Sequence, residues 1–163
     1  MGKVISFDLS TKGVNRAIRQ LERYKSDFQR KCDKLIEKLT DKGVEVAKVR
    51  IASLGKVYSG ELQNSIHGFF DSSSRTGIIR ADAWYAIYVE YGTGVVGAGS
   101  PHPSPDGWVY DAGGHGDKGW TYYNEKDGKF HHTTGEPSAP FMYQTMKELE
   151  TLCAKIAKEV FGS

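Results

Sequence analysis

The feature that most constrains the fold is a run of apolar residues that recurs every three or four positions through the first third of the chain. These positions are Val14, Ile18, Leu21, Phe28, Cys32, Leu35, Leu39, Val46 and Val49. Because the residues between them are mostly charged or polar, the pattern predicts one amphipathic helix of about 35 to 40 residues, begun by Ser10 or Thr11. At about 1.5 Å per residue this helix would reach about 55 Å, more than the width of a compact domain of this size. It must therefore overhang its own domain or lie on another surface.

The sequence leaves the partner of this long helix open. Its apolar spacing resembles a coiled-coil seam, but Lys25 and Lys42 interrupt the seam, so packing on a sheet or on a neighbouring subunit is an equal alternative. Gly43 is expected to bend the helix. The basic residues of the helix are Lys12, Arg16, Arg19, Arg23, Lys31, Lys34, Lys38 and Lys42. The ordinary interpretation is that they form a solvated face, and the sharper alternative is that they contact a nucleic acid.

Length and charge limit the classes of protein to which the chain can belong. Its 163 residues predict a single domain over 1–163, in which 95–137 forms an extended loop and hairpin excursion. The 22 basic and 20 acidic residues nearly cancel, so bulk charge does not indicate a nucleic-acid partner. Cys32 and Cys153 are interpreted as small core residues. Without a signal segment or an apolar run of about 20 residues, we expect a protein made in the cytoplasm that does not enter a membrane.

Short segments after and before the long helix have the patterns of strands and turns. Residues 4–9 alternate and predict an edge strand, whereas 66–70 and 76–81 predict a hairpin joined by the polar turn 71–74. Between the long helix and this hairpin, Ser59 is expected to cap one helical turn that places Leu62 and Ile66 in the core.

The stretch 85–94, Tyr-Ala-Ile-Tyr-Val-Glu-Tyr-Gly-Thr-Gly, is the predicted hub of the fold. As a helix it would begin at Asp82, end at Gly92 and bury a stripe of Trp84, Ile87, Tyr88 and Tyr91. As a strand it would place Tyr85, Ile87, Val89 and Tyr91 on one face. We favour the short helix, because the Gly-Thr-Gly stop follows directly and a strand would set Glu90 on the side of Trp84 and Tyr88.

The composition changes after the hub. Glycine, proline and aromatic residues dominate 95–137, and Asp127-Gly128 predicts a second hairpin. More than 40 residues without a helix would be typical of a functional or partner-contacting segment. A last helix is expected from Ser138-Ala139-Pro140, with an apolar stripe of Met142, Met146, Leu149, Cys153, Ile156 and Val160.

Histidines, a glycine run and one carboxylate are the features of the sequence that could support catalysis. The histidines of 102–132 (His102, His115, His131 and His132) could bind zinc in a metal-dependent hydrolase, but they lack the spacing of a known zinc motif. The glycine run 92–99 lacks the lysine and hydroxyl residue of a phosphate-binding loop. Glu90 is expected to be a structural hydrogen-bond acceptor for the backbone of the Gly92-Thr93 turn. These patterns predict no catalytic residue, no cofactor and no bound metal.

Three motifs occur in an order that resembles a known family. Ser59-Gly60-Glu61-Leu62-Gln63-Asn64-Ser65-Ile66, then Tyr85-Ala86-Ile87-Tyr88-Val89-Glu90-Tyr91-Gly92-Thr93, and then Pro137-Ser138-Ala139-Pro140-Phe141 follow the long helix. This order resembles the phage head–tail joining or tail-completion family of the Hong Kong lambdoid type. The residues that carry the resemblance are Gly60, Leu62, Ser65, Ile66, Tyr85, Ala86, Val89, Glu90, Tyr91, Gly92, Thr93, Pro140 and Phe141. Ser59 in place of threonine and Ser138-Ala139 in place of Ala-Arg are minor departures.

The resemblance implies an α+β fold, with a small antiparallel sheet packed against a long N-terminal helix and a C-terminal helix. It implies a ring of subunits in the neck of a long-tailed virion, between the portal-side connector and the tail terminator or tail tube, with only passive contact with DNA in the channel. A heterologous ring needs two different patches on each subunit. Candidates are the exposed end of the first helix and the excursion, with Trp108, Tyr110, Trp120, Tyr122 and Phe130. Tyr88 and Phe141 are predicted core residues.

Overall fold

The structure is a computed structural model of the chain, and it describes residues 6–54, 60–111, 116–125 and 127–162. Its elements are five α-helices, one 3₁₀ turn and five strands within these ranges. They are α1 (Thr11–Ser53), α2 (Glu61–Asn64), β1 (Ile66–Asp71), β2 (Thr76–Ala81), α3 (Ala86–Tyr91), α4 (Gly94–Gly99), η1 (Gly116–Lys118), β3 (Trp120–Asn124), β4 (Lys129–Thr133), β5 (Gly135–Glu136) and α5 (Phe141–Phe161). The predicted α+β class is confirmed.

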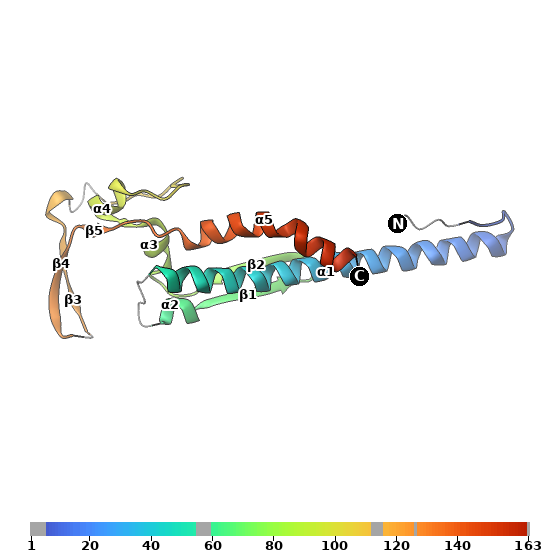
Figure 1. Cartoon of the computed structure of the whole chain (residues 1–163), viewed down its shortest axis with the longest axis horizontal. Coiled ribbons are helices and arrows are strands. Elements are labelled where there is room, and N and C mark those ends of the chain that lie inside the picture. Colours follow the sequence, from blue (N-terminus) through green and yellow to red (C-terminus); the bar gives the residue numbers. More distant parts are fainter. Residues whose placement is uncertain (1–5, 55–59, 112–115, 126, 163) are drawn as a thin grey trace.

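Helix α1 forms the long axis of the molecule (Figure 1). Ser10 caps its first turn, because the Ser10 hydroxyl accepts a hydrogen bond from the Gly13 N–H at 3.1 Å. The helix has 43 residues, slightly more than the apolar period predicts, and it is continuous through Gly43, so the predicted bend is wrong. A Cβ at Gly43 would lie 2.9 Å from the Leu149 Cδ1 atom, so glycine here admits α5 close to α1.

The C-terminal part of α1 lies between two partners. Helix α5 packs along it, and the antiparallel hairpin β1–β2 packs on another face (Figure 1). Small residues stand where the hairpin meets the helix: a Cβ at Gly68 would lie 2.7 Å from Val44 and 2.8 Å from Thr40. The register pairs Ile66 with Ala81 and Asp71 with Thr76, as the hairpin prediction requires.

The main core lies where α1 ends and the hub begins. It contains buried residues from α1, α2, β1, α3 and the start of α5, namely Ala47, Ile51, Leu62, Ile66, Ala86, Val89, Ala139 and Phe141. Leu62, Ile66 and Phe141 are 2%, 0% and 1% exposed, so these three core predictions are confirmed. Ser59, the expected cap of α2, lies outside the described residues, and Gly60 occupies the N-cap position.

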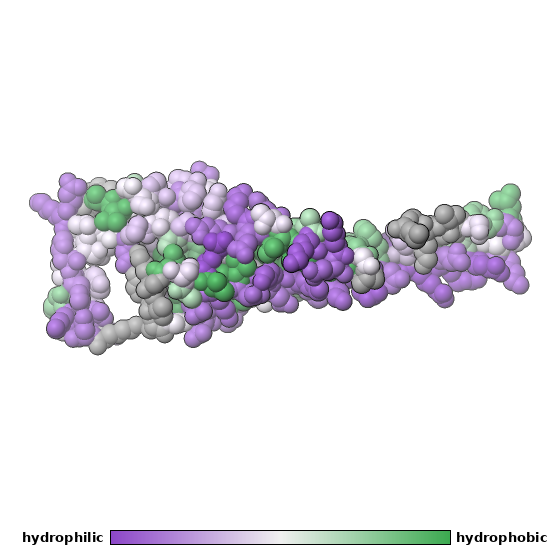
Figure 2. Space-filling model, viewed as in Figure 1, coloured by the Kyte–Doolittle hydropathy of each residue, from purple (hydrophilic) through white to green (hydrophobic). Residues whose placement is uncertain are grey.

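The other end of α1 lies beyond α5 and the β1–β2 hairpin, although Gly13 and Ala17 are buried there. Figure 1 shows that its N-terminal part extends past α5 and past the β1–β2 hairpin, as the length of the pattern predicts. Ile18, Leu21 and Phe28 are 47%, 55% and 50% exposed. Residues 6–9 do not form a strand, so the described part of the predicted edge strand is wrong. Figure 2 shows the molecule narrowing from its broad hairpin end to this thin end.

The excursion is more ordered than its composition predicts. It begins with α4, so the expectation of a segment without a helix is wrong. The second hairpin is confirmed: β3 pairs with β4, with Tyr122 opposite His131 and Trp120 opposite Thr133. Strand β5 crosses beside the hub, where Thr93 and Glu136 form an isolated antiparallel bridge.

Three details of the helices differ from the apolar patterns. Val49 of α1 is 61% exposed although it fits the apolar period. On α5, Met146 is 52% exposed and Cys153 is exposed, while Phe141 and Thr145 take the most buried places. Helix α5 approaches α1 along only part of its own surface, which shifts the contact line away from the predicted stripe. Both cysteines are free thiols.

Candidate functional site

The hub folds as the predicted short helix, but the other side of it is buried. Helix α3 buries Ala86, Val89 and Glu90, whereas Trp84, Ile87 and Tyr88 are 79%, 49% and 46% exposed. The predicted aromatic stripe and the prediction of a buried Tyr88 are therefore wrong. A helix of six residues has little room beside the core, so small side chains face inward and large aromatic ones face outward.

The start of α3 also differs from the prediction. Asp82 does not cap the helix: its carboxylate pairs with Arg80 at 2.5 Å, and Tyr85 occupies the N-cap position without a side-chain cap. The predicted end is confirmed, because Gly92 follows the helix with a φ of 79°. A Cβ at Gly92 would also lie 2.6 Å from the backbone nitrogen of Ser138, so both conformation and space require glycine.

Glu90 is the polar centre of the hub. Its Oε2 atom accepts a hydrogen bond from the Met142 N–H at 2.8 Å, and its Oε1 atom accepts one from the Tyr143 N–H at 2.9 Å. These N–H groups belong to the first turn of α5, where a helix has no internal acceptors. Pro140 stands at the N-cap of α5 and has no side-chain acceptor. Glu90 therefore caps α5 from another helix, and its negative charge lies at the positive end of the helix dipole.

Glu90 is thus a hydrogen-bond acceptor, as expected, but its donors are in α5 instead of the Gly92-Thr93 turn. Backbone contacts reinforce this junction. The Ser138 hydroxyl donates to the Glu90 carbonyl at 2.6 Å, and the Ala139 N–H donates to the Val89 carbonyl at 2.9 Å. The Thr93 hydroxyl accepts from the Glu136 N–H at 3.2 Å. The second and third sequence motifs therefore meet in space and fix the start of α5 on the hub.

His102 completes this buried cluster. Its Nε2 atom lies 3.1 Å from Glu90 Oε1, and its side chain is 3% exposed. On the other side of the ring, Nδ1 lies 3.0 Å from the Ser104 nitrogen and 2.8 Å from the Ser104 carbonyl oxygen. The Tyr91 ring lies against the His102 ring at a centroid distance of 4.4 Å, and the Tyr143 ring meets it in an edge-type contact at 5.3 Å. The sequence does not predict this pair, because nothing in the spacing of Glu90 and His102 connects them.

The segment after His102 is fastened to the hub by aromatic residues. The Trp108 indole N–H donates to the Gly92 carbonyl at 3.1 Å, and its ring stacks on Tyr91 at a centroid distance of 5.0 Å. The Tyr110 hydroxyl accepts from the His102 N–H at 2.9 Å. Trp108 and Tyr110, two of the candidate interface residues, are therefore half-buried within the chain.

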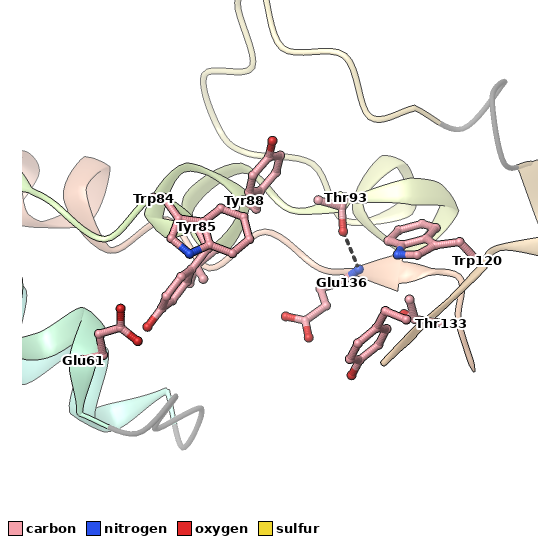
Figure 3. Close-up of a pocket in the computed structure, with 10 residues that line it drawn as sticks. Glu61, Trp84, Tyr85, Tyr88, Thr93, Trp120, Thr133 and Glu136 are labelled. Carbon is pink, nitrogen blue, oxygen red and sulfur yellow. Dashed lines mark hydrogen bonds between the residues drawn. The ribbon is translucent and has the colours of Figure 1, made fainter. Parts of the chain in front are cut away.

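A cavity of about 520 Å³ lies between the hub and the β3–β4 hairpin (Figure 3). Trp84, Tyr85 and Tyr88 line its hub side, while Trp120 and Tyr122 line its hairpin side. Two carboxylates, of Glu61 and Glu136, complete the lining together with Val89, Thr93 and Thr133. Burial and the nearby Glu61 charge raise the pKa of the Tyr85 phenol. We call this cavity the aromatic groove.

The two faces of the β3–β4 hairpin differ in their surroundings. Trp120, Tyr122 and Thr133 share the face that lines the aromatic groove. Tyr123 and Phe130 pair on the opposite face, with ring centroids 5.2 Å apart, and are 54% and 76% exposed. The hairpin therefore presents one aromatic pair to the groove and another to solvent.

The remaining histidines do not converge. His131 Nε2 lies 2.7 Å from the Asp127 carboxylate, and His132 Nε2 lies 2.6 Å from the Lys118 carbonyl oxygen. Adjacent residues of a strand point to opposite faces, and His115 lies outside the described residues. Among the residues that the structure describes, no three histidine, cysteine or acidic side chains are grouped as metal ligands.

Comparison with known proteins agrees with this geometry. No curated protein and no solved structure matches the chain. A family model does match, over residues 15–92, which run from α1 through the hub to Gly92. Its description is "Bacteriophage HK97-gp10, putative tail-component". None of the helices in the described ranges has both the length and the apolar character needed to cross a bilayer. Over residues 15–92 the chain is thus similar to the HK97 gp10-like family of bacteriophage tail components, and this match supports a phage tail-associated structural protein.

Proposed function

We propose that this tail component is a tail-completion or neck protein, which forms a ring and joins the head of a long-tailed phage to its tail. The observation that carries the proposal is the family match over residues 15–92. The match includes α1 and the Glu90 hub, the parts that organise the rest of the fold. The third motif, Pro137 to Phe141, lies beyond the match and packs directly on it through Glu90 and Val89.

The shape of the molecule supports a role in assembly. One end is the part of α1 that extends beyond α5, where Ile18 and Leu21 are about half exposed, and the other is a hairpin with exposed aromatic residues (Figure 1). An elongated subunit with two different ends is suited to heterologous contacts, which close into a ring when the rotation between subunits permits. Self-association of this kind, with α1 and the excursion as its surfaces, is part of the proposal.

The proposed neighbours are the portal-side connector above the ring and the tail terminator or tail tube below it. DNA passing through the channel would meet the protein only passively. The near balance of 22 basic and 20 acidic residues supports this, because a channel wall that bound phosphates tightly would slow the passage of DNA. The proposed location is the neck of the virion, which is assembled in the cytoplasm of the host bacterium.

A joining assay tests the proposal. DNA-filled heads and finished tails are prepared from a phage that carries a nonsense mutation in the gene for this chain, and purified protein is added to the mixture. Electron microscopy should show joined particles only when the protein is present. Unchanged numbers of free heads and tails after addition would overturn the proposed function, and so would joining of equal extent without the protein.

Within the described residues, no observation favours the alternative, a metal-dependent hydrolase. Of its histidines, His102 is committed to Glu90 in the core, and His131 and His132 bind different partners on the hairpin. A tail component is typically a structural protein, and the joining assay requires no substrate turnover.

A further inference from the structure

The N-terminal part of α1 extends beyond α5 and the β1–β2 hairpin, and it carries an apolar stripe beside the buried residues Gly13 and Ala17. We call residues 11–27 the α1 arm. Phe28, at its base, is the first residue to reach α5, where its ring lies 5.7 Å from that of Phe161. Ile18, Leu21 and Tyr24 of the arm are 47%, 55% and 53% exposed. At about 1.5 Å per residue, the arm extends about 25 Å beyond its base.

The charge of the arm indicates what it avoids and what it would attract. Residues 11–27 contain five basic and two acidic residues, whereas 95–137, which supplies much of the aromatic groove, contains six acidic and three basic residues. Lys25 lies on the apolar stripe itself, one turn after Leu21. Two arms paired through this stripe, in either orientation, would place their lysines within an apolar seam, at a cost in stability. The arm is therefore poorly suited to pair with its own copy.

The aromatic groove has the complementary chemistry. Trp84, Tyr88 and Tyr122 offer apolar faces that are 79%, 46% and 47% exposed, and Trp120 lies at the groove's hairpin side. Glu61 and Glu136 place two carboxylates in the same lining. Aromatic faces suit apolar side chains and cations alike, and a nearby carboxylate favours a lysine over a neutral residue. A helix with apolar residues and one lysine along its stripe fits this lining.

The arm and the groove cannot meet within one chain. They lie at opposite ends of the long axis, separated by the length of the α1–α5 layer (Figure 1). A contact between them must therefore join two copies, each of which presents one arm and one groove. Such a contact continues from copy to copy until a ring closes.

We infer that the α1 arm of one copy docks in the aromatic groove of the next, with Ile18 and Leu21 against Trp84 and Tyr122, and Lys25 toward Glu61 and Glu136. This inference rests on the proposed function, because it specifies the contact that builds the proposed ring. The occupant of the groove is a second copy of this chain.

Two single-defect variants of the full chain test the contact. The arm variant, Ile18→Glu with Leu21→Glu, removes the apolar stripe, and the groove variant, Trp84→Lys with Tyr122→Lys, places cations where Lys25 would dock. All four residues are between 47% and 79% exposed, so both variants should fold, as circular dichroism will show. Phe130→Ser is the matched control, because Phe130 is on the same hairpin but on the face away from the groove.

Sedimentation velocity measures the association of each protein alone and in mixtures, up to about 1 mM. The wild type and the Phe130→Ser control should associate in a concentration-dependent way. Each single-defect variant alone should be a monomer, with a Kd raised at least about thirtyfold, as expected for loss of central anchor residues. Mixed together, the two variants should form a 1:1 dimer and nothing larger, since one intact arm and one intact groove remain.

Three results would overturn the inference. A wild type that stays at 18.1 kDa throughout the range has no such contact. A groove variant that still self-associates would show that arms pair with arms. A mixture that remains monomeric while the wild type associates would show that arm and groove are not partners.

The joining assay separates this contact from the function on which it rests. If the variants still self-associate and particles are joined, the arm–groove contact is refuted and the proposed function is intact. A 1:1 dimer from the mixed variants, together with wild-type protein that joins no particles, would refute the proposed function and leave the contact.

Discussion

Removal of the Glu90 carboxylate should destabilise the fold more than any exposed charge. Glu90 is 7% exposed and accepts two backbone hydrogen bonds, at 2.8 Å from Met142 and 2.9 Å from Tyr143. Hydrogen bonds to a charged group contribute about 1.5 to 3 kcal/mol each, and part of this is recovered when water reaches the vacated site. Glu90→Ala should therefore lower the free energy of unfolding by about 3 to 5 kcal/mol, because it leaves two N–H groups without an acceptor.

Glu90→Gln separates the charge from the shape. The carboxylate uses Oε2 for Met142 and Oε1 for Tyr143 and His102, so both oxygens serve as acceptors. An amide has one acceptor oxygen, and its NH₂ group would face either the Met142 N–H or the Tyr143 N–H. The near-isosteric change should still cost about 2 kcal/mol.

Urea unfolding followed by far-ultraviolet circular dichroism measures both changes, with Glu150→Gln as the control. Glu150 also belongs to α5, but it is exposed and pairs only with the exposed Lys147, so its replacement should shift the free energy by less than about 0.5 kcal/mol. Losses below about 1 kcal/mol for both Glu90 variants would refute the conclusion that Glu90 caps α5.

Three further predictions concern the core, a turn and the first hairpin. Phe141→Ala should lower the free energy of unfolding by about 3 to 5 kcal/mol, whereas Tyr88→Ala should lower it by less than about 1 kcal/mol, because Tyr88 is 46% exposed. Equal losses for the two variants, measured by urea unfolding, would contradict the buried side assigned to α3. Gly92→Ala should cost at least about 2 kcal/mol by the same measurement, since its φ is 79° and Ser138 leaves no space for a Cβ, and a neutral result would contradict this turn. Hydrogen bonds from Ser73 and Ser74 lower the pKa of Asp71 to about 2. The stabilisation of the fold by this carboxylate is therefore present above about pH 4 and is lost as the pH falls toward 2. NMR titration of the Asp71 carboxyl checks this, and an ordinary pKa would contradict it.

The sequence predicted most of the elements because their signals are local. The period of α1, the polar turn of the first hairpin, Asp127-Gly128 in the second and Gly92 after α3 each act within a few residues. The burial of particular side chains was less predictable. Leu21 and Val49 fit the same apolar period as Val46, but of the three only Val46 is buried, and the period cannot show how far α5 and the hairpin extend along α1.

The hub illustrates the same limit. Its length and its stop at Gly92 follow from the sequence, yet its buried side was predicted wrongly, because the volume available beside Phe141 depends on α5. The role of Glu90 as an acceptor was predictable from a carboxylate among apolar residues. Its donors were not, since Met142 and Tyr143 are more than fifty residues away. Pro140 gave an unused clue: a helix that begins after proline, without a capping side chain, needs an acceptor from elsewhere.

The interface residues remain predictions. Trp108 and Tyr110 are partly committed to contacts within the chain, whereas Trp120 and Tyr122 line the groove and Phe130 is exposed to solvent. The sequence could not distinguish these three situations, because all five residues stand in similar glycine-rich, aromatic surroundings.

The most direct test of the proposed function is cryo-electron microscopy of the neck of purified virions that encode this chain. The account predicts a closed ring between the connector and the tail, in which each subunit shows a continuous helix of 43 residues, α1, extending toward the broad end of its neighbour. Absence of the chain from the virion, or density for it only at the distal end of the tail, would contradict the account.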